Sequence, residues 1–277
     1  MPEALADAAE TRYTPGPDGE LFAYRRFGRA GGVPLVMCMR LRGTLDHWDP
    51  LLLDLLAADR EIIIFDYRGV NGSTGQPATT IEDMVDGSLA FVRALGLERF
   101  DVLGWSMGGI VAQGIALTAP DLVRRLVVAA SSTGGLPDLP PMSGRTREIM
   151  GKPSYDEEDY LHLFHPDTDQ AREAGRDSLR RMAVRLEQSQ AVVSPEATRA
   201  QFEAIASFQG FWHRRSELTM PTLVAGGAHD TVIHSYALHA MSRELPHAKV
   251  VIYSDAGHGF LAQHAEDFAA EVARFLK

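Results

Sequence analysis

A serine lies among glycines in the stretch "FDVLGWSMGGIVAQ", residues 100–113. Ser106 has Gly104 two positions before it and Gly108 two positions after it. The apolar residues before the serine predict a buried strand, and those after it predict a helix. Because glycine weakens both kinds of element, its presence on both sides indicates a turn too tight for side chains. Such a turn projects the serine hydroxyl, which becomes a nucleophile once a base accepts its proton.

A base and an acid for this serine follow the last two predicted strands. His258 stands in "YSDAGHGF" and Asp230 in "VAGGAHDTVI". The chain order Ser106, Asp230, His258 therefore predicts a catalytic triad of nucleophile, orienting acid and base. Asp255, three residues before His258, is an alternative acid, whereas His229 is expected to point away from the site.

The elements that must position these residues alternate between strand and helix. Short apolar runs predict buried strands, and patterns with apolar residues on one side predict helices. The helix at 79–95 is expected to begin with the capping box Thr79-x-x-Glu82. The segment 13–28, with Pro17-Asp18-Gly19 at its turn, predicts an antiparallel hairpin and brings the expected strands to eight. This order predicts a mostly parallel sheet with helices on both faces. The other strands are expected at 33–39, 61–67, 100–105, 125–131, 222–227 and 249–255, and the helices at 46–58, 79–95, 107–119, 234–245 and 264–276.

One connection is much longer than a crossover helix requires. About 90 residues follow the sixth strand, and we interpret residues 133–219 as a helical cap over the carboxyl edge of the sheet, where such folds bind ligands. A loosely attached surface insertion is the alternative. The expected organisation is a flexible N-terminus at 1–10, a core formed by 11–132 and 220–277, and the cap. Its apolar side chains would shape a pocket: Met142, Met150, Phe164, Phe208, Phe211 and Trp212.

The composition of the chain disfavours several classes of partner and binding site. The formal net charge of −10 disfavours nucleic acid and anionic membranes as partners. The opening "MPEALADAAE" lacks the apolar core of a secretory signal, and no apolar run approaches the ~20 residues of a membrane span. The single cysteine, Cys38, rules out an internal disulfide and a multi-cysteine metal site. We expect a cytoplasmic protein with no cofactor and no metal, since His162 and His165 have no supporting ligand cluster.

The motifs "GWSMGG", "GGAHD", "AGHGF" and "FDYRGVNGST" make the chain resemble the α/β-hydrolase superfamily from about residue 20 to the end. "GWSMGG" is similar to the nucleophile turn of small esterases and of cofactor-free haloperoxidase-type perhydrolases. The resemblance implies an oxyanion hole formed by the backbone N–H groups of Leu41 and Met107. Two positions depart from the family. Met39-Arg40 replaces the usual His-Gly, so Arg40 either brings a cation near the site or forms an ion pair under the loop. Asn71-Gly72 stands where a glycine and a variable residue are common.

We therefore expect a serine hydrolase that cleaves a carboxylic ester or lactone through an acyl-enzyme on Ser106. Its partner would be a small, apolar substrate. Hydrolysis of a carbon–carbon bond or perhydrolysis with the same triad is the alternative, and a non-catalytic ligand-binding member of the fold is a third reading.

Overall fold

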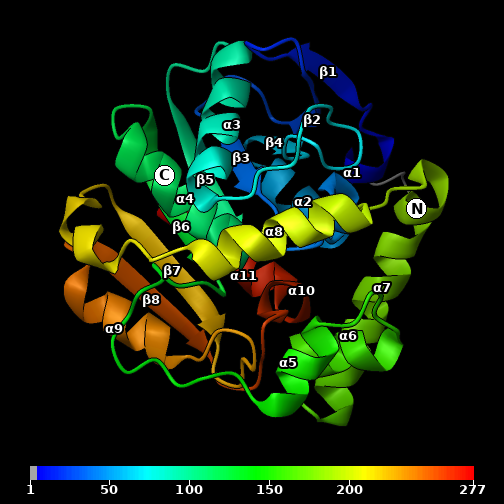
Figure 1. The fold of residues 1–277 in the computed structure, drawn as a ribbon, viewed down its shortest axis with the longest axis vertical. Coiled ribbons are helices and arrows are strands. Elements are labelled where there is room, and N and C mark those ends of the chain that lie inside the picture. The colour runs from blue at the N-terminus through cyan, green and yellow to red at the C-terminus, as the bar shows by residue number, and fades with distance from the viewer. Residues whose placement is uncertain (1–4) are drawn as a thin grey trace.

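The computed structural model describes residues 5–277 and forms one eight-stranded sheet in that range (Figure 1). The strand order is β1-β2-β4-β3-β5-β6-β7-β8, with β3 to β8 parallel and β1 and β2 antiparallel to their neighbours. The predicted mostly parallel sheet is therefore confirmed. The strands are β1 (Arg12–Pro15), β2 (Leu21–Gly28), β3 (Leu35–Cys38), β4 (Glu61–Phe65), β5 (Phe100–Trp105), β6 (Val123–Ala129), β7 (Thr222–Gly227) and β8 (Ala248–Tyr253).

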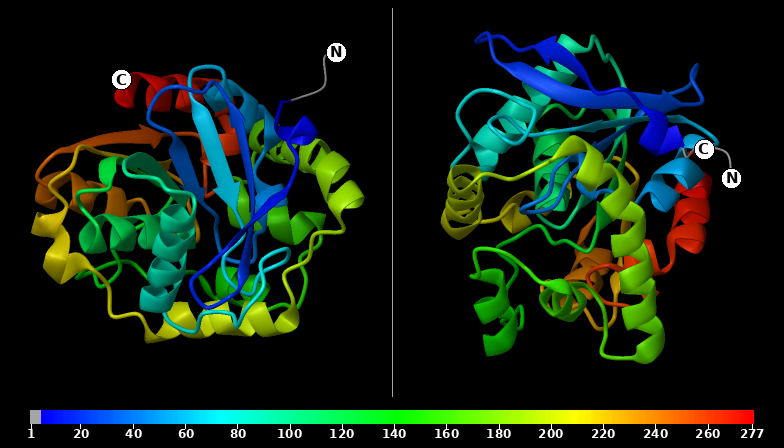
Figure 2. Two further views of the ribbon diagram at one scale, coloured as in Figure 1. Left: turned by 90° about the horizontal axis from the view of Figure 1, so that it is seen from above. Right: turned by 90° about the vertical axis from the view of Figure 1, so that its right-hand side faces the viewer.

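Helices cover both faces of this sheet (Figure 2). Helices α2 and α11 pack against each other on one face, and α3 and α4 pack against each other on the other. Both faces of the central strands are consequently buried, which explains their continuous apolar sequences. These helices are α2 (Pro50–Ala57), α3 (Ile81–Ala94), α4 (Met107–Thr118), α9 (Tyr236–Glu244), α10 (Phe260–Gln263) and α11 (Ala265–Phe275).

Two predicted helix starts are wrong. Helix α3 is capped by Thr80, whose side chain accepts the Asp83 N–H, so the capping box expected at Thr79 does not form. Helix α2 begins at Pro50 behind the cap residue Asp49, because Leu45–His47 form a separate turn of 3₁₀ helix. In both cases the helix starts after a residue whose backbone is extended and whose side chain accepts a backbone N–H of the first turn.

Four further helices lie between β6 and β7, and we refer to them as the cap. Each begins at a side chain that accepts a backbone N–H three residues on, namely Ser143, Asp156, Thr168 and Ser194. Figure 1 shows α8 crossing in front of the sheet and α5 to α7 gathered beside it. The cap helices are α5 (Gly144–Met150), α6 (Glu157–Phe164), α7 (Asp169–Ser189) and α8 (Pro195–Ser207).

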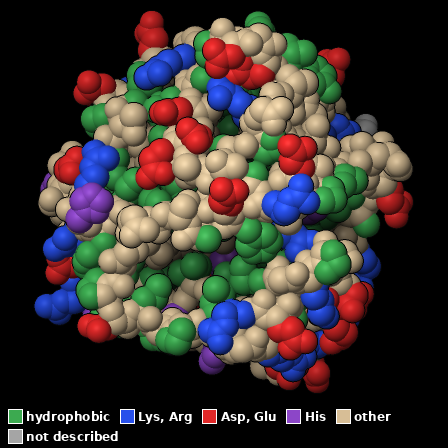
Figure 3. Space-filling view, viewed as in Figure 1, with side chains coloured by type: hydrophobic (Ala, Val, Ile, Leu, Met, Phe, Trp, Pro, Cys, Tyr) green, Lys and Arg blue, Asp and Glu red, His purple; other side chains and the backbone are tan. Residues whose placement is uncertain are grey.

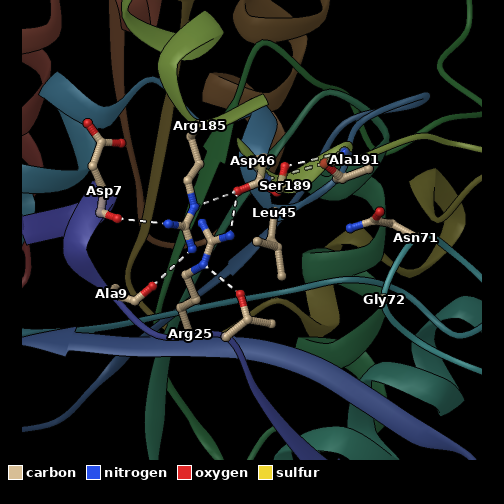
Figure 4. A network of polar contacts seen from close by, with 12 residues as sticks. Asp7, Ala9, Arg25, Leu45, Asp46, Asn71, Gly72, Arg185, Ser189 and Ala191 are labelled. Atoms are coloured by element: carbon tan, nitrogen blue, oxygen red, sulfur yellow. Dashed lines mark hydrogen bonds and ion pairs between the residues drawn. The ribbon is translucent and has the colours of Figure 1, made fainter. Parts of the chain in front are cut away.

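Ion pairs attach α7 to the core. Arg25 of β2 and Asp46 form a buried pair at 2.5 Å, and Arg185 of α7 lies 3.5 Å from the same carboxylate. Figure 4 shows both guanidinium groups pointing at Asp46. A second bridge joins Arg181 to Asp49, the residue that caps α2. The start of α2 is therefore linked directly to the cap.

The N-terminal segment expected to be flexible covers residues 1–10, of which 1–4 lie outside the described residues. Leu5–Ala8 form a short helix, α1, in which Ala6 is buried and donates its N–H to Asp54. Among the described residues, no helix combines the length and apolar character needed to cross a bilayer.

Candidate active site

The turn between β5 and α4 has the tight geometry that the glycines predict. Ser106 adopts φ 57° and ψ −122°, a left-handed conformation that is strained for a residue with a side chain. A Cβ on Gly104 would lie 2.0 Å from the Gly108 carbonyl oxygen, and one on Gly108 would lie 2.0 Å from the Cys38 carbonyl oxygen. Only glycine fits at these two positions, and the backbone of β3 is pressed against the start of α4.

His258 and Asp230 are brought together at the same edge. His258 Nδ1 lies 2.8 Å from Asp230 Oδ2, and both side chains are buried. The other carboxylate oxygen of Asp230 accepts the backbone N–H groups of Val232 and Ile233, each at 2.8 Å. Asp230 is therefore fixed as an acceptor, and the hydrogen bond leaves Nε2 of His258 as the ring nitrogen available for proton transfer.

The alternative residues lie elsewhere. Asp255 is exposed and pairs with His264, whose Nε2 lies 2.9 Å from its carboxylate. His229 is exposed, and its backbone N–H donates to the Ala256 carbonyl. Of the carboxylates considered, only Asp230 contacts His258.

A hydrogen bond joins the end of β5 to the loop that carries His258. Trp105, which immediately precedes Ser106, donates its indole N–H to the His258 carbonyl at 3.1 Å. The Trp105 ring also lies 6.2 Å from the His258 ring, centroid to centroid. Trp105 was not recognised from the sequence, where it looks like one more apolar strand residue. The two triad segments, separated by about half of the chain, therefore meet at its side chain.

The two N–H groups expected to bind an oxyanion have no acceptor. Within residues 5–277, the backbone N–H groups of Leu41 and Met107 donate no hydrogen bond. Met107 is the first residue of a twelve-residue helix, so its N–H belongs to the positive end of the helix dipole. The Met39 carbonyl is held by the Tyr67 hydroxyl at 3.0 Å, which anchors the loop that carries Leu41.

Arg40 forms neither an ion pair nor a free surface cation. Its guanidinium lies against the rings of Trp105 and Phe164, 5.2 and 5.0 Å from their centroids, and these two rings contact each other at 5.6 Å. One of its nitrogens donates to the Leu41 carbonyl at 2.9 Å. Within the described range, no carboxylate lies within ion-pair distance, and burial lowers the pKa of Arg40. The sequence left two roles open for Arg40. Within residues 5–277 the ion pair under the loop does not form, and the cation lies against two rings that also neighbour His258.

The end of α6 contacts the loop that carries His258. The Phe164 carbonyl accepts the Gly259 N–H at 2.7 Å, and the Phe164 ring lies 5.5 Å from the His258 ring. His165 is buried, and burial lowers its pKa to about 4, so it is neutral near pH 7. Asn71, the second departure from the family pattern, takes the left-handed conformation and donates its amide to Asp66.

A cleft lies close to this region, and one face of the molecule is hollowed. A cleft of about 620 Å³ is lined by His165 and His229, which neighbour Phe164 and Asp230 in the chain. Figure 3 shows a hollow bordered by hydrophobic side chains below α8. No group of three or more histidine, cysteine or acidic side chains arranged to hold a metal ion occurs in residues 5–277.

Comparison with known proteins agrees with the fold. The family model described as "alpha/beta hydrolase fold" matches residues 33–265. RutD of Azorhizobium caulinodans, whose name gives carbamate hydrolysis as a provisional activity, is 26% identical over 90% of this chain and 92% of its own. The pimeloyl-[acyl-carrier protein] methyl ester esterase of Aliivibrio salmonicida is 26% identical over 83% of this chain and 87% of its own.

A solved structure is also similar throughout. The alpha/beta hydrolase fold protein from Chitinophaga pinensis has a TM-score of 0.86, with 29% identity over 98% of each chain. Since the family model covers most of the sequence, this chain belongs to the α/β-hydrolase fold family.

Proposed function

We propose that the protein is a serine hydrolase that cleaves a carboxylic ester or lactone, with Ser106, His258 and Asp230 as its catalytic triad. The observation that carries the proposal is the 2.8 Å hydrogen bond between His258 and Asp230, at the sheet edge where Ser106 occupies a strained turn. The name of the Aliivibrio relative, an esterase, supports ester chemistry.

In the proposed reaction, Ser106 Oγ attacks the substrate carbonyl while His258 Nε2 accepts the hydroxyl proton. Asp230 holds Nδ1–H and stabilises the imidazolium. The backbone N–H groups of Leu41 and Met107 bind the oxyanion, and each such donor contributes on the order of 10²–10³ in rate. His258 then returns the proton to the leaving alcohol, and water attacks the acyl-enzyme with His258 again as base.

We further propose that residues 133–219 form a lid over the core, 11–132 and 220–277, and that the lid selects a small-molecule substrate. Phe164 and Tyr160 of α6 are stacked with ring centroids 4.5 Å apart, and the Phe164 ring reaches that of His258. This aromatic surface favours an apolar acyl chain or ring in the pocket.

The experiment measures turnover of aryl esters, lactones and ring-cleavage diketones by the wild type, Ser106→Ala and Ser254→Ala. Ser254 is exposed on the segment after β8 and serves as the matched control. Ester or lactone turnover should fall by several orders of magnitude in Ser106→Ala and remain at the wild-type level in Ser254→Ala. Near-normal ester turnover by Ser106→Ala would overturn the proposal, and turnover of diketones alone would replace it with carbon–carbon bond hydrolysis.

A further inference from the structure

Within the described part of the chain, the charge of Arg40 has no acidic partner. Only 7% of the residue is exposed, and no Asp or Glu of residues 5–277 lies within ion-pair distance of it. Burying a cation is costly unless an opposite charge or a full set of hydrogen bonds compensates. The two neighbouring aromatic rings and the loop carbonyls compensate only in part, since a π face attracts a cation far less than a carboxylate does.

The charge contacts the same aromatic rings as the proposed catalytic base. Trp105 and Phe164, the rings against which the Arg40 guanidinium lies, have their centroids 6.2 and 5.5 Å from the centroid of His258. Arg40 also precedes Leu41, whose N–H is proposed to bind the oxyanion. Arg40 therefore adjoins the group that would bind the substrate carbonyl.

Two buried N–H donors around Trp105 have no acceptor. Nη1 of Arg40 donates to the carbonyls of Leu41 and Arg42, at 2.9 and 3.4 Å, but its Nε is buried and donates to nothing. The indole N–H of Trp48 is buried without an acceptor as well, and the Trp48 ring lies 5.9 Å from the Trp105 ring. Unsatisfied buried donors are uncommon in folded proteins, and a ligand that supplies acceptors explains them.

The ionised side chains that line the cleft beside the site carry no net negative charge that would repel an anion. Its two guanidinium groups, Arg145 and Arg172, balance its two carboxylates, Glu158 and Asp167, whereas the chain as a whole carries a formal charge of −10. The remaining ionisable residues that line it are histidines. An anionic molecule that enters here avoids the net repulsion expected over the rest of the surface.

We propose that Arg40 binds a carboxylate on the acyl part of the substrate, so that the enzyme acts on half-esters or lactones of dicarboxylic acids. A carboxylate matches the planar, multiply donating guanidinium and supplies the missing opposite charge. This inference rests on the proposed function, because it names the substrate class of the same site.

The test compares substrates that differ only in that carboxylate. The 4-nitrophenyl half-esters of adipic and pimelic acid carry it, and 4-nitrophenyl hexanoate and heptanoate have a methyl group in its place. The wild type should show kcat/KM at least about tenfold higher for the half-esters, as expected for a hydrogen bond to a charged group. Equal values for the charged and neutral esters at both chain lengths would overturn the assignment.

Variants of Arg40 test whether this residue causes the preference for charged esters. Arg40→Met should lower the ratio of kcat/KM between charged and neutral esters by about 10- to 100-fold, and Arg40→Lys should retain part of it. Arg180→Met is the matched control, because Arg180 is an exposed arginine of α7. A ratio unchanged in folded Arg40→Met would overturn the assignment, and when that variant does not fold, a wild-type ratio close to one would do so.

A binding measurement separates this inference from the proposed function. Monomethyl adipate is titrated calorimetrically into Ser106→Ala and into Ser106→Ala/Arg40→Met. About tenfold or greater weakening in the double variant would support Arg40, and equal affinity would contradict it, with or without ester turnover by the wild type. Absence of turnover for all four esters together with Arg40-dependent binding would reject the hydrolase proposal alone.

Discussion

At the scale of single residues, two aspartates that contact histidines differ in geometry, and the difference separates the proposed catalytic pair from a surface pair. Asp230 is buried, contacts His258 and also accepts two backbone N–H groups. Asp255 contacts His264 but is exposed to solvent. Only the first arrangement fixes the tautomer of its histidine and can stabilise an imidazolium away from water.

We predict that Asp230→Asn lowers kcat for an aryl ester by about 10³–10⁴-fold, because the amide cannot stabilise the imidazolium. Asp255→Asn is the matched control and should remain close to the wild type. Steady-state kinetics on both variants test this. Equal losses in the two variants, or a greater loss in Asp255→Asn, would reassign the acid.

The residues of the proposed triad could be selected from the sequence because each follows a recognisable strand and because their order along the chain is distinctive. Trp105 and the role of Arg40 could not be predicted in this way. Both depend on which side chains meet across the loops after β3, β5 and β8, and nothing in the local pattern specifies those contacts. A buried arginine without a carboxylate partner becomes visible only when its surroundings are known.

At the scale of elements, the turn from β5 to α4 depends on close backbone approach. The Cys38 carbonyl occupies the space that a Cβ on Gly108 would need, at 2.0 Å. Because the contact is with backbone, a larger residue must displace β3 or α4, and this would move Met107 with it.

We predict that Gly108→Ala lowers the free energy of unfolding by at least about 2 kcal/mol and reduces ester turnover. Gly144→Ala, at the start of α5, is the control, since a Cβ there meets no atom within 4 Å. It should leave stability unchanged or raise it slightly. Urea unfolding and turnover measured on both variants decide the matter. Equal stability of the two would mean that the turn tolerates a side chain.

The central strands and the core helices α2, α3, α4, α9 and α11 were predictable from apolar periodicity, but some of their boundaries and the separate helices of the cap were not. Thr79 and Thr80 are chemically identical as capping residues, and only the observed extended backbone of Thr80 shows which one starts α3. Likewise, the apolar pattern from residue 46 onward does not reveal that Asp49 caps α2 after a separate turn. Capping depends on local backbone conformation as well as residue type.

At the scale of the whole molecule, the Arg25–Asp46 pair joins three parts of the chain (Figure 4). Arg25 comes from the hairpin, Asp46 from the segment after β3, and Arg185 from the cap. Their side chains meet although they are far apart in sequence, so composition and spacing could not predict this junction.

We predict that Asp46→Asn destabilises the protein by about 3–5 kcal/mol, because it leaves the buried Arg25 without a countercharge. Asp177→Asn removes an exposed pair with Arg180 on α7 and should leave the thermal midpoint nearly unchanged. Differential scanning calorimetry provides the comparison. A loss below about 1 kcal/mol for Asp46→Asn would show that the junction does not contribute to stability.

The central claim, that Ser106 is an activated nucleophile, is tested most directly by intact-mass measurement after treatment with a fluorophosphonate. We predict one covalent adduct per chain, mapped to Ser106 by peptide sequencing, absent from Ser106→Ala and formed much more slowly in His258→Gln. An unmodified wild-type chain, or an adduct on any other residue, would contradict the account.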